Sequence, residues 1–161
     1  MIETRLASPS DVADVQTIID AAFATVREVY RPKPDATPTS ENAGLKTETF
    51  VVSMDGEIKG SVCFYSQAKA LQISQLAVVP EFRKRGVARA LLQAANQAAT
   101  KRGATELRLN TIQETGNVAI FQRLGFTIHS TTKATWCISD RFEQLNDVLM
   151  TQRCSRRLGF A

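Results

Sequence analysis

The stretch that decides the fold is Leu76-Ala77-Val78-Val79-Pro80-Glu81-Phe82-Arg83-Lys84-Arg85-Gly86-Val87-Ala88-Arg89. Its first four residues are all apolar, which predicts the end of a strand that is buried on both faces. Pro80 cannot continue a strand in the middle of a sheet. From about residue 85 to 102 apolar residues recur at helical spacing, and Gly103 stands where a C-terminal cap belongs. The stretch therefore predicts a buried strand, a basic turn and a helix.

The turn between this strand and this helix has the composition of a phosphate site. The first N–H groups of a helix have no partner within the helix, and the helix dipole adds partial positive charge, so an anion there satisfies several donors at once. Gly86 lets a phosphate reach the backbone, Ala88 keeps the next turn small, and four side chains can add charge-assisted contacts: Arg83, Lys84, Arg85 and Arg89. A basic helix start is by itself more often only a solvated face. The turn matches neither G-x-x-x-x-G-K-[ST] nor G-x-G-x-x-G.

Hydrophobic periodicity and turn residues predict an alternation of strands and helices around this stretch. Ser8-Pro9-Ser10-Asp11 predicts a helix start, with apolar residues every three or four positions to about residue 29. The prolines between residues 31 and 38 predict a long loop, and Asp55-Gly56 predicts a hairpin between strands 48–54 and 57–65. The remaining predictions are strands at 2–7, 70–79 and 107–109, a helix at 117–123, strand-like segments at 126–132 and 135–138, and a final strand at 148–153 that closes the sheet.

Composition limits the class of protein. The chain has 161 residues, enough for one domain, so residues 1–161 are taken as a single unit. An apolar fraction of 43%, a charged fraction of 22% and the lack of a long apolar run favour a globular protein that does not enter a membrane. The N-terminus lacks a secretory signal, which favours the cytoplasm. Cys63, Cys137 and Cys154 read as separate thiols, and His129 has no metal-ligand spacing to other residues.

Two motifs together identify a family resemblance. The order R-x-x-G-x-A, after a strand ending in L-A-V-x-P-E, resembles the Gcn5-related N-acetyltransferase (GNAT) family, whose pattern is [QR]-x-x-G-x-[GA]. A second stretch, Glu114-Thr115-Gly116-Asn117 followed by Phe121-Gln122-Arg123-Leu124-Gly125-Phe126, is similar to the family's later segment. Order, spacing and the predicted elements also agree. The resemblance covers nearly the whole chain and is weakest in residues 30–46 and after Thr131.

The resemblance implies a fold and a cosubstrate. The fold would be a single-domain α/β fold with a mixed, mostly antiparallel sheet of six to seven strands flanked by helices. Two adjacent parallel strands, ending near Val78 and Asn110, would splay apart to admit the pantetheine arm of acetyl-coenzyme A, and no metal would take part. The residues that the resemblance assigns to the cofactor are Leu76, Ala77 and Val78 along the arm, Arg83, Lys84, Arg85, Gly86, Val87, Ala88 and Arg89 at the pyrophosphate, and Asn117 and Phe121 on the other side of the arm. Asn117 is also expected to cap its helix.

The implied reaction is direct attack of a primary amine on the thioester in a ternary complex. A backbone N–H near Val78 would stabilise the oxyanion. Many relatives have a tyrosine at the position of Phe121, and its hydroxyl is thought to protonate the leaving thiolate; here a water, the product ammonium or a side chain such as Tyr30 could serve. Glu81 and Glu114 cannot be placed by spacing, so the catalytic residues stay unassigned. We expect the acceptor site at the loop 30–46, the strand end near Gln75 and the segment after Thr131.

Two functions of other classes remain open. One is a non-catalytic coenzyme A-binding sensor or regulatory module, which the lack of a tyrosine at Phe121 makes conceivable. The other is an RNA-binding domain that uses the basic turn and tail, but the chain has no aromatic RNA-binding motif, so nucleic acid is disfavoured. The expected partners are acetyl-coenzyme A and an amine acceptor, either a small molecule or a protein amine. A homodimer is also conceivable.

Overall fold

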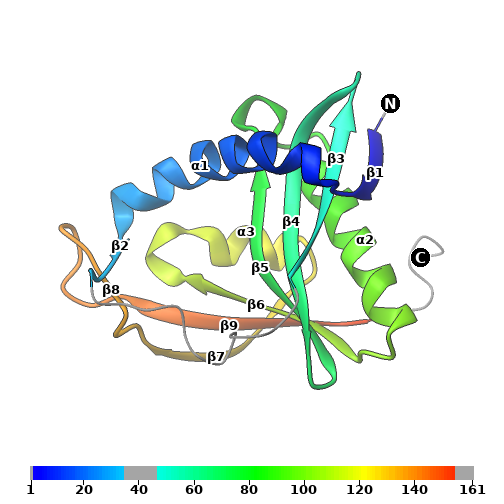
Figure 1. The fold of residues 1–161 in the computed structure, drawn as a ribbon. Coiled ribbons are helices and arrows are strands. Elements are labelled where there is room, and N and C mark those ends of the chain that lie inside the picture. Colours follow the sequence, from blue (N-terminus) through cyan, green and yellow to red (C-terminus); the bar gives the residue numbers. More distant parts are fainter. Residues whose placement is uncertain (1, 35–46, 155–161) are drawn as a thin grey trace.

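Seven strands form one mixed sheet in the computed structural model of the chain, which describes residues 2–34 and 47–154 (Figure 1). The strand order is β1-β3-β4-β5-β6-β9-β7, and only β5 and β6 run parallel to each other. This confirms the predicted fold class. The bounds of these strands are Ile2–Leu6 for β1, Glu48–Met54 for β3, Glu57–Gln67 for β4, Ala70–Val78 for β5, Glu106–Ile112 for β6, Thr127–Lys133 for β7 and Asn146–Arg153 for β9.

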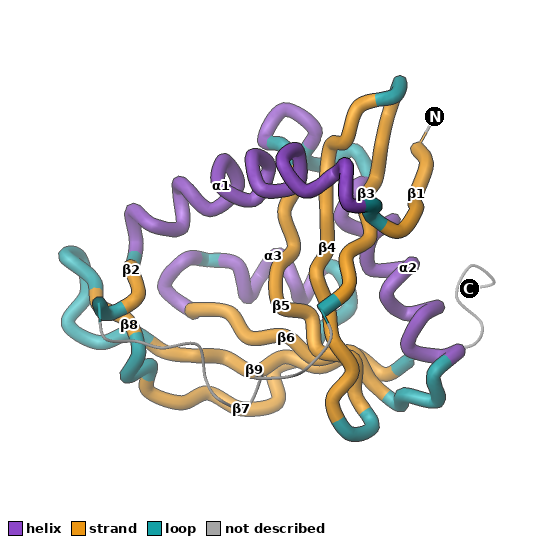
Figure 2. Tube along the Cα trace, in the orientation of Figure 1, coloured by secondary structure: helices purple, strands orange, loops and turns teal. Residues whose placement is uncertain are grey.

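Helices cover both faces of the sheet (Figure 2). Helix α1, Val12–Val29, packs its apolar side on one face against Val51 and Ala77. Helices α2, Val87–Lys101, and α3, Asn117–Arg123, belong to the larger core on the other face, which includes Phe64 and Leu91. The sheet therefore separates an α1 side from an α2 side, and any opening between its strands connects the two.

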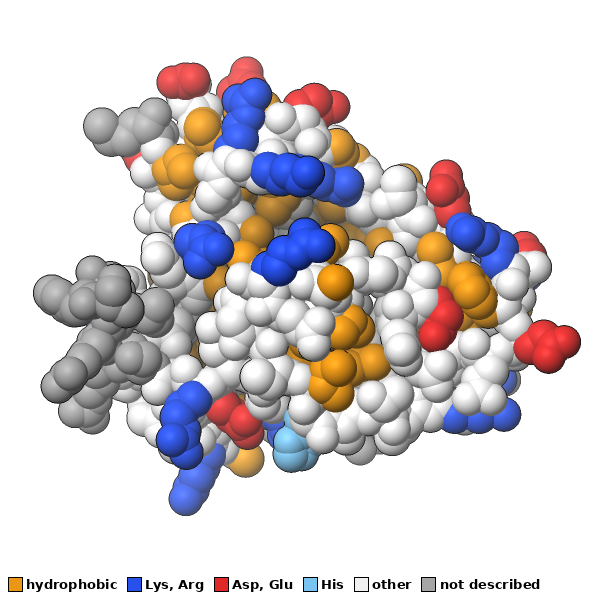
Figure 3. All heavy atoms as spheres, turned by 180° about the vertical axis from the view of Figure 1, so that it is seen from behind, with side chains coloured by type: hydrophobic (Ala, Val, Ile, Leu, Met, Phe, Trp, Pro, Cys, Tyr) orange, Lys and Arg blue, Asp and Glu red, His pale blue; other side chains and the backbone are white. Residues whose placement is uncertain are grey.

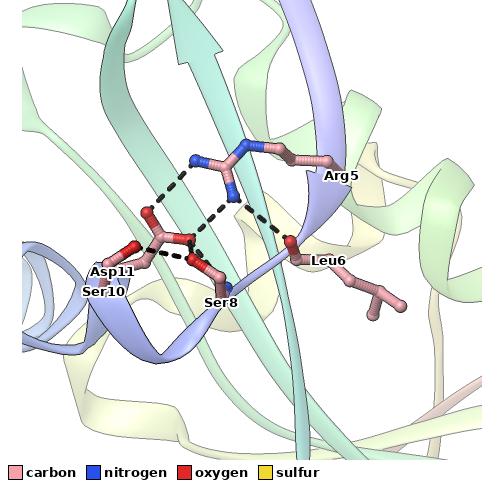
Figure 4. Close-up of polar contacts among 5 residues, drawn as sticks. All are labelled: Arg5, Leu6, Ser8, Ser10 and Asp11. Atoms are coloured by element: carbon pink, nitrogen blue, oxygen red, sulfur yellow. Dashed lines mark hydrogen bonds and ion pairs between the residues drawn. The ribbon is translucent and has the colours of Figure 1, made fainter.

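The start of α1 is fixed by the carboxylate of Asp11 (Figure 4). Its oxygens accept hydrogen bonds from the Arg5 guanidinium at 2.7 and 3.1 Å and from the Ser8 N–H at 2.7 Å. The Arg5 guanidinium, and after it the Ser8 N–H, hold the pKa of this carboxyl well below its usual range. The predicted helix start is confirmed, and the contact with Arg5 joins it to β1.

The hairpin at Asp55-Gly56 is confirmed as well. Both residues have positive φ, 54° and 81°, and strands β3 and β4 pair on either side of them. This is the conformation that a two-residue turn of matching twist requires.

Two predictions at the C-terminal half were wrong. The last strand does not close the sheet: β9 lies inside it, pairing with β6 on one side and β7 on the other, and its Val148 and Met150 are buried. The prolines after residue 30 do not lead directly into a loop, because Arg31–Pro32 forms a short strand β2 that pairs with β8, Cys137–Ile138. The rest of the predicted loop, residues 35–46, lies outside the described residues.

Candidate active site

The basic turn presents free backbone donors at the start of α2. Gly86 is the N-cap, with φ 84° and ψ 4°, and the first bond of the helix runs from the Ala90 N–H to the Gly86 carbonyl at 3.0 Å. The N–H groups of Val87, Ala88 and Arg89 come before that bond and have no acceptor within the helix. A Cβ at Gly86 would meet no atom within 4 Å, so the space in front of these donors is open.

Side chains of the turn are arranged around that backbone. Val87 is buried, at 1% exposed, whereas Arg83, Lys84, Arg85 and Arg89 are exposed. When the molecule is viewed from behind, Lys and Arg side chains gather in its upper part around an apolar hollow, at the end where Figure 1 shows the start of α2 (Figure 3). The turn thus combines an anchored apolar residue with mobile positive charge around open N–H groups.

Two residues that support this turn were missed by the sequence analysis. Gly60 of β4 lies directly beneath Val87 and Leu91, so its lack of a side chain allows α2 to approach the sheet. The ring of Phe82 has the Lys59 ammonium 4.5 Å and the Arg85 guanidinium 4.9 Å from its centroid. No local sequence pattern marks either contact, because both join the turn to a strand more than 20 residues earlier.

Strands β5 and β6 part in the middle of the sheet. Their pairing runs from Ala70 opposite Glu106 to Ile73 opposite Leu109 and then stops, while β5 continues to Val78 on β4 and β6 continues to Ile112 on β9. The predicted splayed pair is confirmed. Each strand therefore has an unpaired inner edge beyond this point.

The direction of the backbone along β5 follows from one hydrogen bond. The Val79 N–H donates to the Lys59 carbonyl of β4 at 2.9 Å. Because successive residues of a strand direct their N–H and C=O groups to opposite edges, Ala77 also faces β4, while Leu76 and Val78 face the open edge. Of the three predicted residues on this strand, Leu76 and Val78 thus have backbone groups available to a ligand.

A cleft of about 580 Å³ opens where the strands part. Three of the predicted cofactor residues line it, Leu76, Asn117 and Phe121, whereas Ala77, Val78 and the basic turn do not. Tyr30 and Gln75, which were expected near the acceptor, line the same cleft. The remaining lining comes from α1, β5, β6 and the C-terminal half: Gln16, Ile19, Asp20, Phe23, Ala24, Val26, Arg27, Ile73, Ser74, Leu109, Asn110, Thr111, Ile112, Thr115, Trp136 and Asp147.

Asn117 does not cap its helix, so this part of the prediction was wrong. The N-cap of α3 is Gly116, with φ 82°, and Asn117 is the first helical residue. Its backbone N–H donates to the Thr115 Oγ1 at 3.3 Å. The glycine adopts the left-handed conformation that an asparagine would adopt less easily, and Asn117 is left as part of the cleft wall.

The two carboxylates that sequence spacing could not place are now located. Glu114 accepts hydrogen bonds from the Asn146 N–H at 2.6 Å and from the Asn146 Nδ2 at 3.0 Å, so it fixes the start of β9. Glu81 is exposed in a short 3-10 turn before the basic turn. Neither carboxylate lines the cleft.

Trp136 and Asp147 are cleft residues that the sequence analysis did not single out. The pairing of β2 with β8 brings Tyr30 against Trp136, with ring centroids 5.6 Å apart at 90°. The Trp136 Nε1 donates to the Asp147 Oδ2 at 3.3 Å. The one available signal was that the chain has a single tryptophan, and that is not enough to assign a site.

Cysteine and metal chemistry have no counterpart in the cleft. Cys63 and Cys137 are buried and Cys154 is half-buried, as free thiols, and burial raises the pKa of each. Within residues 2–34 and 47–154 no group of three His, Cys, Asp or Glu side chains could hold a metal ion. Among the helices that the structure describes, none has the length and apolar character needed to cross a membrane.

Comparison with known proteins agrees with this geometry. The acetyltransferase (GNAT) family profile matches residues 15–126. No curated protein matches the chain. Similar solved structures include nourseothricin acetyltransferase (21% identity, TM-score 0.70, covering 96% of this chain and 99% of that one) and the ribosomal-protein-S18-alanine N-acetyltransferase from Escherichia coli (19%, 0.73, 96% and 95%). A third is the PaiA N-acetyltransferase from Thermoplasma acidophilum in complex with coenzyme A (16%, 0.73, 95% and 99%).

Proposed function

Because the chain belongs to the acetyltransferase (GNAT) family, we propose that it transfers an acetyl group from acetyl-coenzyme A to a primary amine. The observation that carries this proposal is the parting of β5 from β6 after Ile73 and Leu109, beside a helix start with free N–H groups. The pairing gap and the basic turn together match the two chemically different parts of the cosubstrate, an amide-containing arm and a pyrophosphate. The similar PaiA structure was solved as a complex with coenzyme A, which supports the assignment.

The arm would lie along the open edge of β5. Leu76 and Val78 direct their backbone groups to that edge, so they would pair with the pantetheine amides as a neighbouring strand does. Asn117 and Phe121 line the cleft from α3, on the far side of the gap. The arm would thus complete the hydrogen bonding of a strand that β6 has left.

The pyrophosphate would lie at the start of α2. The N–H groups of Val87, Ala88 and Arg89 would donate to its oxygens, and Gly86 would leave room for it. Exposed arginine and lysine side chains would add screened attraction around this contact.

The transfer itself needs positioning more than a covalent enzyme group. The amine nitrogen forms a bond to the thioester carbon, the C–S bond breaks, and the proton lost by the amine is gained in the end by the thiolate. The Val78 N–H would stabilise the carbonyl oxygen as negative charge develops on it. Phe121 has no proton to give, and Tyr30 is the one tyrosine in the cleft lining, so the group that protonates the thiolate stays open.

A thermal-shift experiment tests the cosubstrate assignment. Acetyl-coenzyme A at about 100 times its dissociation constant should stabilise the protein by about 2.7 kcal/mol. We expect Gly86→Glu to abolish this gain, because its carboxylate would repel the pyrophosphate. The matched control is Gly103→Glu, a glycine of similar positive φ (76°) and equally open surroundings at the other end of α2, which should keep the gain.

Release of free thiol in the presence of mixed amines separates an enzyme from a sensor. Stabilisation without thiol release would favour the non-catalytic coenzyme A-binding module. Loss of the gain in both glutamate variants would contradict the placement of the pyrophosphate. The homodimer and the cytoplasmic location expected from the sequence stay predictions.

A further inference from the structure

A chain of hydrogen bonds orients one carboxylate on the α1 side of the cleft. The Asp147 Oδ1 accepts a hydrogen bond from the Asn110 Nδ2 at 3.0 Å, and its Oδ2 accepts one from the Trp136 Nε1 at 3.3 Å. Asn110 in turn accepts a hydrogen bond from the Gln72 Nε2 at 3.3 Å. A carboxylate has about four acceptor positions, so both oxygens of Asp147 keep capacity for a further donor.

Asn110 stands directly at the point where the strands part. It follows Leu109, the last β6 residue that pairs with β5. The carboxylate bonded to Asn110 is therefore next to the opening through which the thioester would be presented. Asp147 is only half-buried, so the cleft reaches it.

An aromatic pair adjoins this carboxylate. Trp136 is 39% exposed and packs edge-to-face on Tyr30. A large aromatic ring that is left partly exposed beside a carboxylate suits a ligand with a positive charge, because the ring face and the carboxylate both attract cations. The β2–β8 pair holds these rings in place from two distant parts of the chain.

The charges of the cleft lining also favour a cation. The lining contains Asp147 and Asp20, and its one cationic side chain is Arg27. The guanidinium of Arg27 lies over the Tyr30 ring, 5.2 Å from the centroid. The cleft lining thus has an excess of one negative charge in a chain whose formal net charge is +4.

We propose that Asp147 binds an ammonium group of the acceptor, and that the acceptor is an amine with a second positive charge. This inference rests on the proposed function. The reacting nitrogen must lose a proton before it attacks, whereas a carboxylate in contact favours the protonated form of an amine. Asp147 therefore suits the second, non-reacting ammonium, and the acceptor class is that of diamines and larger cationic amines.

Three probes of equal chain length test this class: 1,4-diaminobutane, butylamine and 4-aminobutanoate. They differ only in the second end group, which is an ammonium, a methyl or a carboxylate. We expect wild-type kcat/KM to fall in that order. Asp147→Asn should raise KM for the diamine about tenfold or more, in line with the loss of a charge-assisted hydrogen bond. It should change kcat by less than about twofold and leave butylamine unaffected.

The matched control is Asp140→Asn, which removes a carboxylate from the same segment outside the cleft. Asp140 is 82% exposed at its side chain and pairs with Arg31 at 3.0 Å. The control should change none of the three probes. Equal losses for the diamine and butylamine in Asp147→Asn would mean a structural role and overturn the proposal, and so would a preference for 4-aminobutanoate, which would point to Arg27.

Failure of the proposed function gives a different result. If no probe releases thiol, calorimetric titration of 1,4-diaminobutane into the acetyl-coenzyme A complex still tests the inference. Binding that Asp147→Asn weakens about tenfold would support it, and binding that ignores the substitution would overturn it.

Discussion

Gly60 of β4 and Val87 of α2 are so close that a Cβ at Gly60 would stand 2.6 Å from the Val87 Cγ1 and 3.1 Å from the Ala77 carbonyl oxygen. The second contact is with backbone, which cannot move aside as a side chain can. The position that begins α2, and with it the free N–H groups, is therefore set by the absence of one methyl group on a neighbouring strand.

We expect Gly60→Ala to destabilise the protein by about 1–3 kcal/mol, the usual cost of overpacking, and also to weaken acetyl-coenzyme A binding. Urea unfolding and a binding titration measure the two effects. Gly103→Ala is the control, since it strains a positive φ at the far end of α2 and has no close neighbour. It should lower stability without lowering affinity, and an unchanged affinity in Gly60→Ala would contradict the link between the two sites.

The Arg5–Asp11 contact predicts an acid-dependent stability. The pKa of Asp11 is lowered in the folded state, so its stabilisation is complete above the ordinary value of about 4. It is lost as the pH falls from there toward the folded value. We expect Asp11→Asn to lower Tm clearly at pH 7 and much less at pH 3.

Thermal unfolding of both proteins across that range measures the difference. Asp14→Asn removes an exposed carboxylate from the first turn of the same helix and serves as the comparison. A gap between wild type and Asp11→Asn that stays constant from pH 7 to pH 3 would rule out the linkage.

Charge around the turn should matter less than its backbone. Arg89 is exposed, and exposed ion pairs contribute at most about 1 kcal/mol. We expect Arg89→Ala to weaken acetyl-coenzyme A binding by about threefold at low salt and hardly at all in 0.5 M NaCl, where the Debye length is short. Titrations at both salt concentrations, with Arg141→Ala as a distant control, measure this, and a loss that persists at high salt would show a direct buried contact instead.

Phe121 offers a gain-of-function test. It lines the cleft and packs edge-to-face on Phe126, 6.0 Å away. Phe121→Tyr would supply a phenol at the position where many relatives have one, and we expect kcat to rise by up to about tenfold, because general acids contribute substantially to such steps. Initial rates at saturating substrates measure it, with Phe142→Tyr on the exposed surface as control, and a reduced kcat would show that another group already protonates the thiolate.

The elements that could be predicted are those encoded by neighbouring residues. Asp55-Gly56 and the helix start at Ser8 to Asp11 depend on contacts within four residues, and the alternation along α1 depends on its own apolar face. The splayed pair was also predicted, but from the family resemblance rather than from spacing.

What could not be predicted depends on pairing across long distances. Strand β9 reads the same at the edge or inside the sheet, and only its two neighbours, β6 and β7, decide which. Strands β2 and β8 have two residues each, too short for any periodicity, yet they bring Tyr30 to Trp136. Gly116 took the cap expected of Asn117 because a positive φ there favours glycine.

The parted strands have a consequence for evolution and folding alike. Polar main-chain groups inside a protein are normally satisfied by other parts of the same molecule, but here part of the seam between β5 and β6 is reserved for a visitor. A metabolite then serves as the missing stitch of the sheet, and mutations along this seam should alter shelf life and turnover together.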